Sequence, residues 1–290
     1  MGVLRNMLRV RQLNHAVRGV AGVLLPAGPR RSFRRRLPAV DPFCFELPNG
    51  RAIHWDPQGD LMARSLRNDG WDGYDPESTR LFYRLAQTAE IVLDIGAYMG
   101  YFALLGAGAG QRNRAFAFEA VPLVQDMCQC ILNLNPSFAV ELIGAAIGDR
   151  TGEVEIYIPN KETELPTTST NPSYHPGRRG LKVPALRIDD FVARRNLPSV
   201  DLVKIDTETT ESEVLAGMAE TVRRFRPTIL LEVLREARVD KLNLFLRENH
   251  YKVAWITKQG LRPREAVVAD PTHECMNQLF LPVENAWTDP

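Results

Sequence analysis

The sequence predicts an α/β fold in which helices cover both faces of a mostly parallel β-sheet. Short apolar runs alternate with helical segments along most of the chain, and this alternation is typical of parallel sheets. The 290 residues, with 44% hydrophobic and 24% charged side chains, describe an ordinary globular chain that can bury a large core. We therefore expect ligands to bind near the carboxyl ends of the strands.

The individual elements follow from local patterns along the chain. Two strands flank Pro48-Asn49-Gly50, because Asn-Gly is typical of a tight hairpin turn. The later strands are short apolar runs, and the helices are the periodic segments between them. We expect strands at 43–47, 51–55, 91–94, 115–118, 140–145, 153–158, 202–205, 228–232, 252–256 and 278–281, and helices at 77–88, 101–108, 123–134, 189–195, 211–223 and 240–248.

The first 36 residues differ from the rest in charge. They contain nine arginines and no acid, so residues 37–290 carry 27 basic and 35 acidic side chains, although the whole chain has a net charge of +1. An acidic body disfavours nucleic-acid binding, because that affinity comes from neutralising phosphates. The tail is an amphipathic helix that contacts an anionic membrane surface, a transit peptide, or a flexible extension.

Membrane spans and disulfides are not expected. The longest apolar stretch near the start, Gly19 to Leu25, is far shorter than the roughly 20 residues that cross a bilayer. The four cysteines are too few and too scattered for a disulfide framework, and Cys128 and Cys130 have the wrong spacing for a zinc or redox motif. This pattern indicates a reducing compartment, and we expect a cytoplasmic protein.

A glycine-containing loop follows the strand at 91–94. The segment Asp94-Ile95-Gly96-Ala97-Tyr98-Met99-Gly100 joins this strand to a helix, where glycine allows close approach of a ligand and the helix start offers free N–H groups. It lacks the G-x-G-x-x-G pattern that fits a pyrophosphate. The acid before Gly96 repels phosphate and attracts an ammonium or hydroxyl group, so the loop suits a ligand with an amino-acid part.

A second acid completes this pattern. Glu119 ends the next strand, where a carboxylate is well placed to accept hydrogen bonds from ribose hydroxyls. An amino-acid group and a ribose without phosphate describe S-adenosylmethionine.

Motifs along the chain resemble those of the FkbM family of methyltransferases. The run Val92–Phe102 is similar to the first motif of that family, and Phe118-Glu119 is similar to the second. Further similar segments follow in order at Ala146–Gly152, Leu186–Phe191, Asp201–Glu208, Glu211, Val214–Gly217 and Arg226–Glu232. Each motif alone is weak, but the ordered set over residues 75–282 is specific.

The resemblance implies a three-layer Rossmann-like class I methyltransferase fold. We expect a seven-stranded, mostly parallel sheet with an antiparallel last strand, and a small N-terminal β element before it. The chain is then divided into a basic tail at 1–36, a β-hairpin element at 37–74 and an S-adenosylmethionine-dependent methyltransferase domain at 75–290.

The resemblance also implies transfer of a methyl group from S-adenosylmethionine to a hydroxyl of a small acceptor, such as a sugar, a glycolipid or a natural product. The residues that it assigns to the cofactor are Asp94, Gly96, Ala97, Gly100, Glu119, Asp149 and Asp206. The catalytic candidates are Asp206, Glu208 and His175, with Glu232 and Lys204 as further candidates near the same strand ends. The loop at 159–181 is expected to contact the acceptor.

The role of the acids after the strand at 202–205 stays open. Asp206 is a base, a partner of the cofactor ammonium or a ligand of a divalent cation such as magnesium, which prefers oxygen ligands. Glu208 and Glu211 either complete such a metal site or satisfy N–H groups at a helix start.

The chain departs from the family pattern in the loop expected at the active site, and this departure bears on whether the protein is active. The family usually has a glycine and a small residue after the Asp-x-Glu pair, whereas this chain has Thr209-Thr210, and a β-branched residue is strained wherever φ is positive. The main alternative is therefore a non-catalytic or drifted S-adenosylmethionine-binding protein. A nicotinamide-dependent oxidoreductase is a second alternative, against which the incomplete glycine pattern argues.

Overall fold

The computed structural model describes residue 39 and residues 41–58, 60, 62–158 and 179–287. The chain divides into two units, one containing the residues up to Pro76 together with Asn133–Asn135, the other containing Glu77–Leu132 and the residues from Pro136 onwards. The arginine-rich tail, His175 and most of the 159–181 loop lie outside the described residues, so the expectations for them stay predictions.

The described residues of the first unit form an antiparallel hairpin and one helix. Strand β1 (Phe43–Glu46) pairs with β2 (Ala52–Trp55), and helix α3 (Met62–Asp69), which the sequence patterns did not predict, follows them. In the turn, the N–H of Gly50 donates to the carbonyl of Leu47 at 2.9 Å. Gly50 has a φ of +80°, which glycine adopts without strain.

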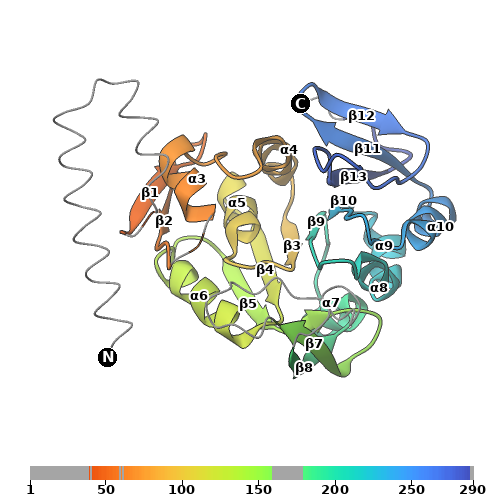
Figure 1. Cartoon of the computed structure of the whole chain (residues 1–290), viewed down its shortest axis with the longest axis horizontal. Coiled ribbons are helices and arrows are strands. Elements are labelled where there is room, and N and C mark those ends of the chain that lie inside the picture. The colour runs from red at the N-terminus through yellow and green to blue at the C-terminus, as the bar shows by residue number, and fades with distance from the viewer. Residues whose placement is uncertain (1–38, 40, 59, 61, 159–178, 288–290) are drawn as a thin grey trace. The chain divides into compact units, whose positions relative to one another are not determined.

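The described residues of the second unit form an eight-stranded sheet. Its strands are β3 (Ile91–Ile95), β4 (Arg114–Glu119), β5 (Val140–Gly144), β9 (Leu202–Ile205), β10 (Thr228–Glu232), β11 (Tyr251–Thr257), β12 (Gly260–Arg264) and β13 (Asn277–Pro282). Their order is β12-β11-β13-β10-β9-β3-β4-β5 (Figure 1). The five strands from β10 to β5 are parallel, and β13 is antiparallel to both of its neighbours. This arrangement confirms the predicted sheet with its antiparallel last strand, to which β12 adds an eighth strand at one edge.

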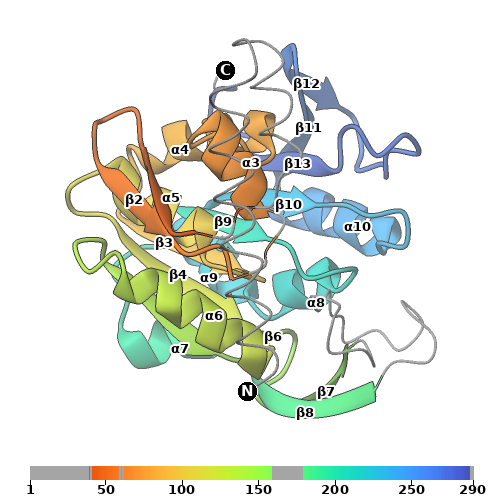
Figure 2. The ribbon, with the colours of Figure 1, turned by 60° about the vertical axis from the view of Figure 1, so that its left-hand side comes forward.

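Helices cover both faces of this sheet, as predicted. They are α4 (Pro76–Ala86), α5 (Tyr101–Ala109), α6 (Pro122–Asn133), α7 (Ile188–Arg195), α8 (Glu211–Ala216), α9 (Ala219–Phe225) and α10 (Val239–Asn249). Helices α7 to α10 pack on one face, where Leu215 and Phe245 join a buried cluster with Leu93 of the sheet (Figure 2). On the opposite face α5 lies so close that a Cβ at Gly106 would come within 2.9 Å of Val92.

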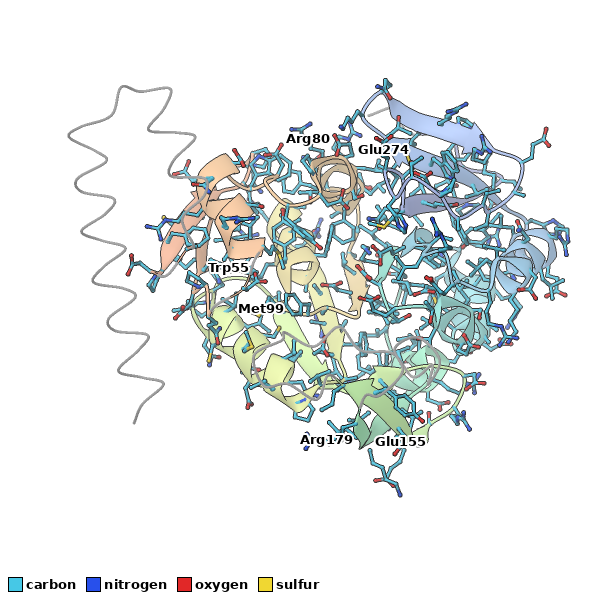
Figure 3. All side chains as sticks on the ribbon, in the orientation of Figure 1. Trp55, Arg80, Met99, Glu155, Arg179 and Glu274 are labelled. Atoms are coloured by element: carbon cyan, nitrogen blue, oxygen red, sulfur yellow. The ribbon has the colours of Figure 1, made fainter. Side chains whose placement is uncertain are left out.

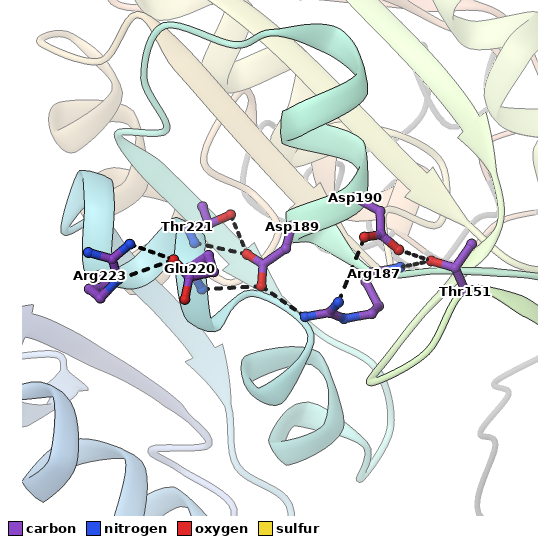
Figure 4. Close-up of polar contacts among 7 residues, drawn as sticks. All are labelled: Thr151, Arg187, Asp189, Asp190, Glu220, Thr221 and Arg223. Atoms are coloured by element: carbon purple, nitrogen blue, oxygen red, sulfur yellow. Dashed lines mark hydrogen bonds and ion pairs between the residues drawn. The ribbon is translucent and has the colours of Figure 1, made fainter.

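The segment predicted as one helix at 211–223 forms two helices. Its interruption lies at Gly217, where an added Cβ would be 1.9 Å from the carbonyl oxygen of Gly148. A new helix then starts because the carboxylate of Asp189 accepts the N–H groups of Glu220 and Thr221 at 3.1 and 2.8 Å (Figure 4). The motif that contains Asp189 therefore fixes where α9 begins.

A separate three-stranded sheet lies between β5 and α7 in the chain. Its strands are β6 (Ala146–Ile147), β7 (Gly152–Ile158) and β8 (Arg179–Leu186), in the order β6-β8-β7. Of these, β7 matches a predicted strand and β8 was not predicted. Glu155 and Arg179 lie exposed on this sheet (Figure 3). Thr151 anchors it to α7, since its hydroxyl accepts the N–H of Arg187 and donates to Asp190 (Figure 4).

Within the described part of the chain, no helix has the length and apolar character needed to cross a membrane.

Replacing Asp189 is expected to destabilise the fold. Its side chain is only 8% exposed, and it accepts hydrogen bonds from Glu220, from Thr221 and from Arg187. We expect Asp189→Ala to lower the free energy of unfolding by about 1–3 kcal/mol, measured by urea denaturation. Asp126→Ala is the control because that side chain is exposed on α6. Equal losses in both variants would contradict the capping role of Asp189.

Candidate active site

The candidate site is built at the carboxyl ends of three neighbouring strands, β9, β3 and β4. The loop after β3 is held between the other two, because Gly96 and Ala97 donate their N–H groups to the carbonyl of Phe118 at 3.0 and 2.9 Å. The N–H of Asp206 in turn donates to the carbonyl of Ile95 at 2.9 Å. Three chain segments that are far apart in sequence are thereby fixed in one place.

Gly96 cannot be replaced without moving this loop. Its φ is +78°, and a Cβ there would lie 1.8 Å from the carbonyl oxygen of Asp206. Gly100, at the start of α5, has a φ of +77°, and a Cβ there would lie 2.9 Å from the sulfur of Cys128. The two glycines of the motif are therefore required by a close backbone contact and by the left-handed conformation.

Glu119 is anchored at the end of β4. One carboxylate oxygen accepts the N–H of Tyr98 at 3.0 Å, and the other accepts the N–H of Val121 at 2.8 Å. Burial raises the pKa of Glu119 to about 7, although these N–H groups act in the opposite direction. The N–H of Ala120 acts on the same carboxyl group and also lowers its pKa, so the group is held rigidly by its backbone neighbours.

Asp94 is buried beneath the loop, with 2% of its surface exposed. Its Oδ2 accepts the N–H of Ala103 in α5 at 2.8 Å, so the side chain ties β3 to the helix that follows the loop. Burial raises the pKa of Asp94 to about 7, while the nearby ammonium of Lys204 lowers it. The structure therefore places Asp94 as an anchor of the loop.

A buried lysine and two carboxyl groups meet at the ends of β9 and β10. Lys204 is 1% exposed, lies 5.5 Å from the ring of Phe102, and donates to Asp206 at 3.2 Å. Burial would raise the pKa of Asp206, but Lys204 and a hydrogen bond from Glu232 outweigh it and leave the pKa below its ordinary value. Burial and the adjacent Asp206 raise the pKa of Glu232 far above its ordinary value. Glu232 is thus the protonated partner that donates to an ionised Asp206, whose side chain is 33% exposed.

The loop from Thr207 to Thr210 is organised by Glu211. One carboxylate oxygen of Glu211 accepts the N–H of Thr207 at 3.3 Å, its hydroxyl at 3.2 Å and the N–H of Thr209 at 3.1 Å. Glu211 is 2% exposed, and burial raises its pKa to about 7. Of the two roles open for this residue, the geometry favours satisfying N–H groups at the start of a helix.

Two consecutive residues of this loop have left-handed backbones. Glu208 has a φ of +54° and Thr209 a φ of +80°. A β-branched residue in this region is strained, so the position where the family pattern has glycine does need positive φ.

The remaining residues that the sequence predicts for the site are Asp149, Glu208 and His175. Asp149 is exposed and pairs with Arg150 at 3.6 Å. Glu208 is half-buried and raises the pKa of Glu232 through its charge. His175 lies outside the described residues. Among the described residues, no group of three or more His, Cys, Asp or Glu side chains is arranged to hold a metal ion.

The sequence patterns missed a group of charged residues that only the fold brings together. Arg238 and Lys241 precede and begin α10, and both pair with Glu213 of α8, at 3.2 and 3.6 Å. None of the three belongs to a motif. The available signal was the spacing of two cations three residues apart at the start of a predicted helix, and such a pair is common on solvated surfaces.

The chain is similar to known methyltransferases. A sequence model of the FkbM methyltransferase domain matches residues 94–253. The 2-O-methyltransferase NoeI of Sinorhizobium fredii is 28% identical over 148 residues, which cover 47% of this chain and 60% of the length of NoeI.

Solved structures give fold similarities at low identity. The FkbM methyltransferase from Methylobacillus flagellatus KT is 16% identical with a TM-score of 0.44, and the match covers 66% of this chain and 43% of that one. The O-methyltransferase TomG from Streptomyces achromogenes is 14% identical with a TM-score of 0.45. That match covers 79% of this chain and 91% of TomG.

The close contact at Gly96 can be separated from the cost of its backbone conformation. Gly50 has nearly the same φ but no atom within 4 Å of an added Cβ. We expect Gly50→Ala to cost about 1–2 kcal/mol in the free energy of unfolding. Gly96→Ala should cost at least about 3 kcal/mol more, because the loop has to shift. Chemical denaturation of both variants measures the difference, and similar losses would argue against the close contact.

The protonated state of Glu232 predicts a pH dependence of stability. As the pH rises above the ordinary value of 4.5, the unfolded chain releases this proton while the folded chain keeps it, so the free energy of unfolding falls. Glutamine mimics the protonated carboxyl and does not titrate. We expect the melting temperature of Glu232→Gln, relative to the wild type, to rise between about pH 5 and about pH 9.

The control for this experiment is Glu153→Gln, since Glu153 is exposed on β7. If the difference between Glu232→Gln and the wild type were the same at all pH values, Glu232 would not hold a proton in the folded state.

Proposed function

The chain belongs to the FkbM methyltransferase family, and we propose that it transfers the methyl group of S-adenosylmethionine to a hydroxyl oxygen of a small acceptor. The observation that carries this proposal is the position of two acids on either side of the Gly96 loop. An anchored Glu119 ends β4 on one side, and an ionised Asp206 follows β9 on the other. A sugar, a glycolipid or a natural product provides the hydroxyl.

The residues present fit this cofactor. Backbone hydrogen bonds hold the carboxyl group of Glu119 at the end of β4, where an acid is well placed to accept a hydrogen bond from a ribose hydroxyl. The absence of a side chain at Gly96 lets this loop lie directly against Asp206, so that the two acids are held on either side of it. The buried acids Asp94, Glu119 and Glu211 oppose a phosphate, which argues for an adenosyl cofactor without phosphate and against a dinucleotide.

When bound, S-adenosylmethionine supplies an electrophilic methyl group on a sulfonium. Transfer of this methyl group to the acceptor oxygen would break the sulfur–carbon bond and release the hydroxyl proton, which needs an acceptor. In this proposal the ionised Asp206 accepts that proton. Its lowered pKa is sufficient, because the hydroxyl proton becomes strongly acidic as the new oxygen–carbon bond forms.

Lys204 and Glu232 keep the side chain of Asp206 ionised and oriented for this role. The buried ammonium of Lys204 stabilises the negative charge, and the hydrogen bond from Glu232 fixes the orientation of the carboxylate. Glu232 is therefore a positioning residue in this scheme. His175 and Glu208 stay candidates for further contacts to the acceptor.

Thermal unfolding of the full chain with S-adenosylmethionine, S-adenosylhomocysteine or NADH tests the cofactor. A ligand present at about a hundred times its dissociation constant raises the free energy of unfolding by about 2.7 kcal/mol. For a chain of this size the melting temperature then rises by about 5–10 °C. We expect this shift with the two adenosyl compounds and none with NADH. Glu119→Ala should abolish it, whereas Asp126→Ala, an exposed carboxylate on α6, should leave it unchanged.

The same preparations, given S-adenosylmethionine with a labelled methyl group and a panel of hydroxylated acceptors, test the reaction. Asp206→Asn should bind the cofactor but form methylated product at least about a hundredfold more slowly. Cofactor binding without product on any acceptor would favour a non-catalytic relative, and a shift with NADH alone would contradict the proposal.

A further inference from the structure

A cleft of about 460 Å³ lies beside the candidate active site, between the small sheet, the loop after β9, and the starts of α8 and α10. Of the residues that the resemblance assigns to the cofactor, Asp149 lines this cleft, whereas Asp94, Gly96 and Glu119 do not. Most of the cleft is therefore separate from the residues around the Gly96 loop.

The walls of the cleft differ in polarity. Ile147, Val154 and Ala185 of the small sheet form an apolar wall. Thr209 and Thr210 line it from the loop after β9, and the hydroxyl of Thr210 donates to the carbonyl of Thr207 at 3.1 Å. An apolar wall beside polar residues suits a hydroxylated ring, which has both kinds of surface.

The remaining lining residues carry an excess of positive charge. Arg150, Arg238 and Lys241 are opposed by only two carboxylates, those of Asp149 and Glu213. Arg238 and Lys241 both approach the same oxygen of Glu213, at 3.2 and 3.6 Å. A guanidinium has five N–H donors and an ammonium has three. Arg238 and Lys241 therefore keep donors for a further anion, while Glu213 holds the two cations in position.

The strained residue of the active-site loop lines this same cleft. Thr209 has a φ of +80° and is 3% exposed, although glycine at this position would remove the backbone strain. Strain of this kind persists where surrounding contacts enforce it, and it gathers at ligand sites. Its place on the cleft wall is therefore an independent indication of a binding site.

The cleft lies close to the proposed reaction centre. Only Thr207 and Glu208 separate Asp206 from Thr209, so their Cα atoms are at most about 11 Å apart. A ligand of one or two sugar rings spans such a distance.

We propose that this cleft binds the acceptor and selects one that carries a negative charge on a hydroxylated ring. The group is a carboxylate or a phosphate, held by Arg238 and Lys241, while the ring packs between the small sheet and Thr209. This inference rests on the proposed methyl transfer, because it assigns the acceptor of that reaction.

Binding of three sugars to the full chain tests the proposal. Glucuronic acid, glucose 6-phosphate and glucose share one ring and differ in charge, so we expect the two acidic sugars to bind at least about tenfold more tightly than glucose, by isothermal titration. The double variant Arg238→Gln/Lys241→Gln should lose this preference. The matched control Arg223→Gln/Arg224→Gln removes two cations from α9, neither of which lines the cleft, and should keep it.

The outcomes separate this proposal from the proposed function. Affinity for S-adenosylhomocysteine should be unchanged in the double variant, and a loss there would assign the cleft to the cofactor and overturn the proposal. Equal affinity for glucose and the acidic sugars, or no binding of either acidic sugar at millimolar concentration, would also overturn it. The sugars are titrated with and without S-adenosylhomocysteine, so a wild type that binds the acidic sugars but not the adenosyl compound contradicts methyl transfer alone.

Discussion

The contact between Gly96 and Asp206 determines the geometry of the whole site. A backbone with no Cβ lies against the carbonyl oxygen of Asp206, and hydrogen bonds from this loop reach the end of β4 on its other side. The ends of β9, β3 and β4 are thereby brought to a spacing that no larger residue at position 96 would permit. Glu119 and Asp206 lie at the two sides of this contact, so their relative placement is a property of the backbone rather than of flexible side chains.

Electrostatics around this contact depend on one buried cation. Lys204 has Asp94, Asp206 and Glu232 as its charged neighbours. A single ammonium cannot neutralise three carboxylates at low solvent exposure, so protons must neutralise the others. The fold decides which acid stays ionised: Lys204 donates directly to Asp206, and Glu232 donates to the same carboxylate. Asp206 is then both ionised and partly exposed, which is the arrangement that a proton acceptor needs.

The sequence predicted the central sheet well because its strands are buried and apolar, so that hydrophobicity alone locates them. It missed β8 and β12, which contain Pro184 and Pro263, because proline argues against a strand in the sequence pattern. Such strands form because a neighbour offers backbone partners, as β11 does for β12, and that information is not local. The same holds for the site. Glycines and acids at strand ends were visible as motifs, whereas Arg238, Lys241 and Glu213 meet only through the packing of two helices.

In the proposed acceptor site, Thr209 links the backbone of the loop to the choice of acceptor. Its backbone conformation is imposed by the loop, since its N–H donates to the buried Glu211 and the next residue, Thr210, is the N-cap of α8. Glycine would satisfy the same hydrogen bond without strain, so backbone geometry gives no reason for threonine. What threonine adds is a side chain among the residues that line the charged cleft. Under the proposal that this cleft binds the acceptor, the strain is a cost of shaping the acceptor site, and it argues for a changed specificity rather than a lost activity.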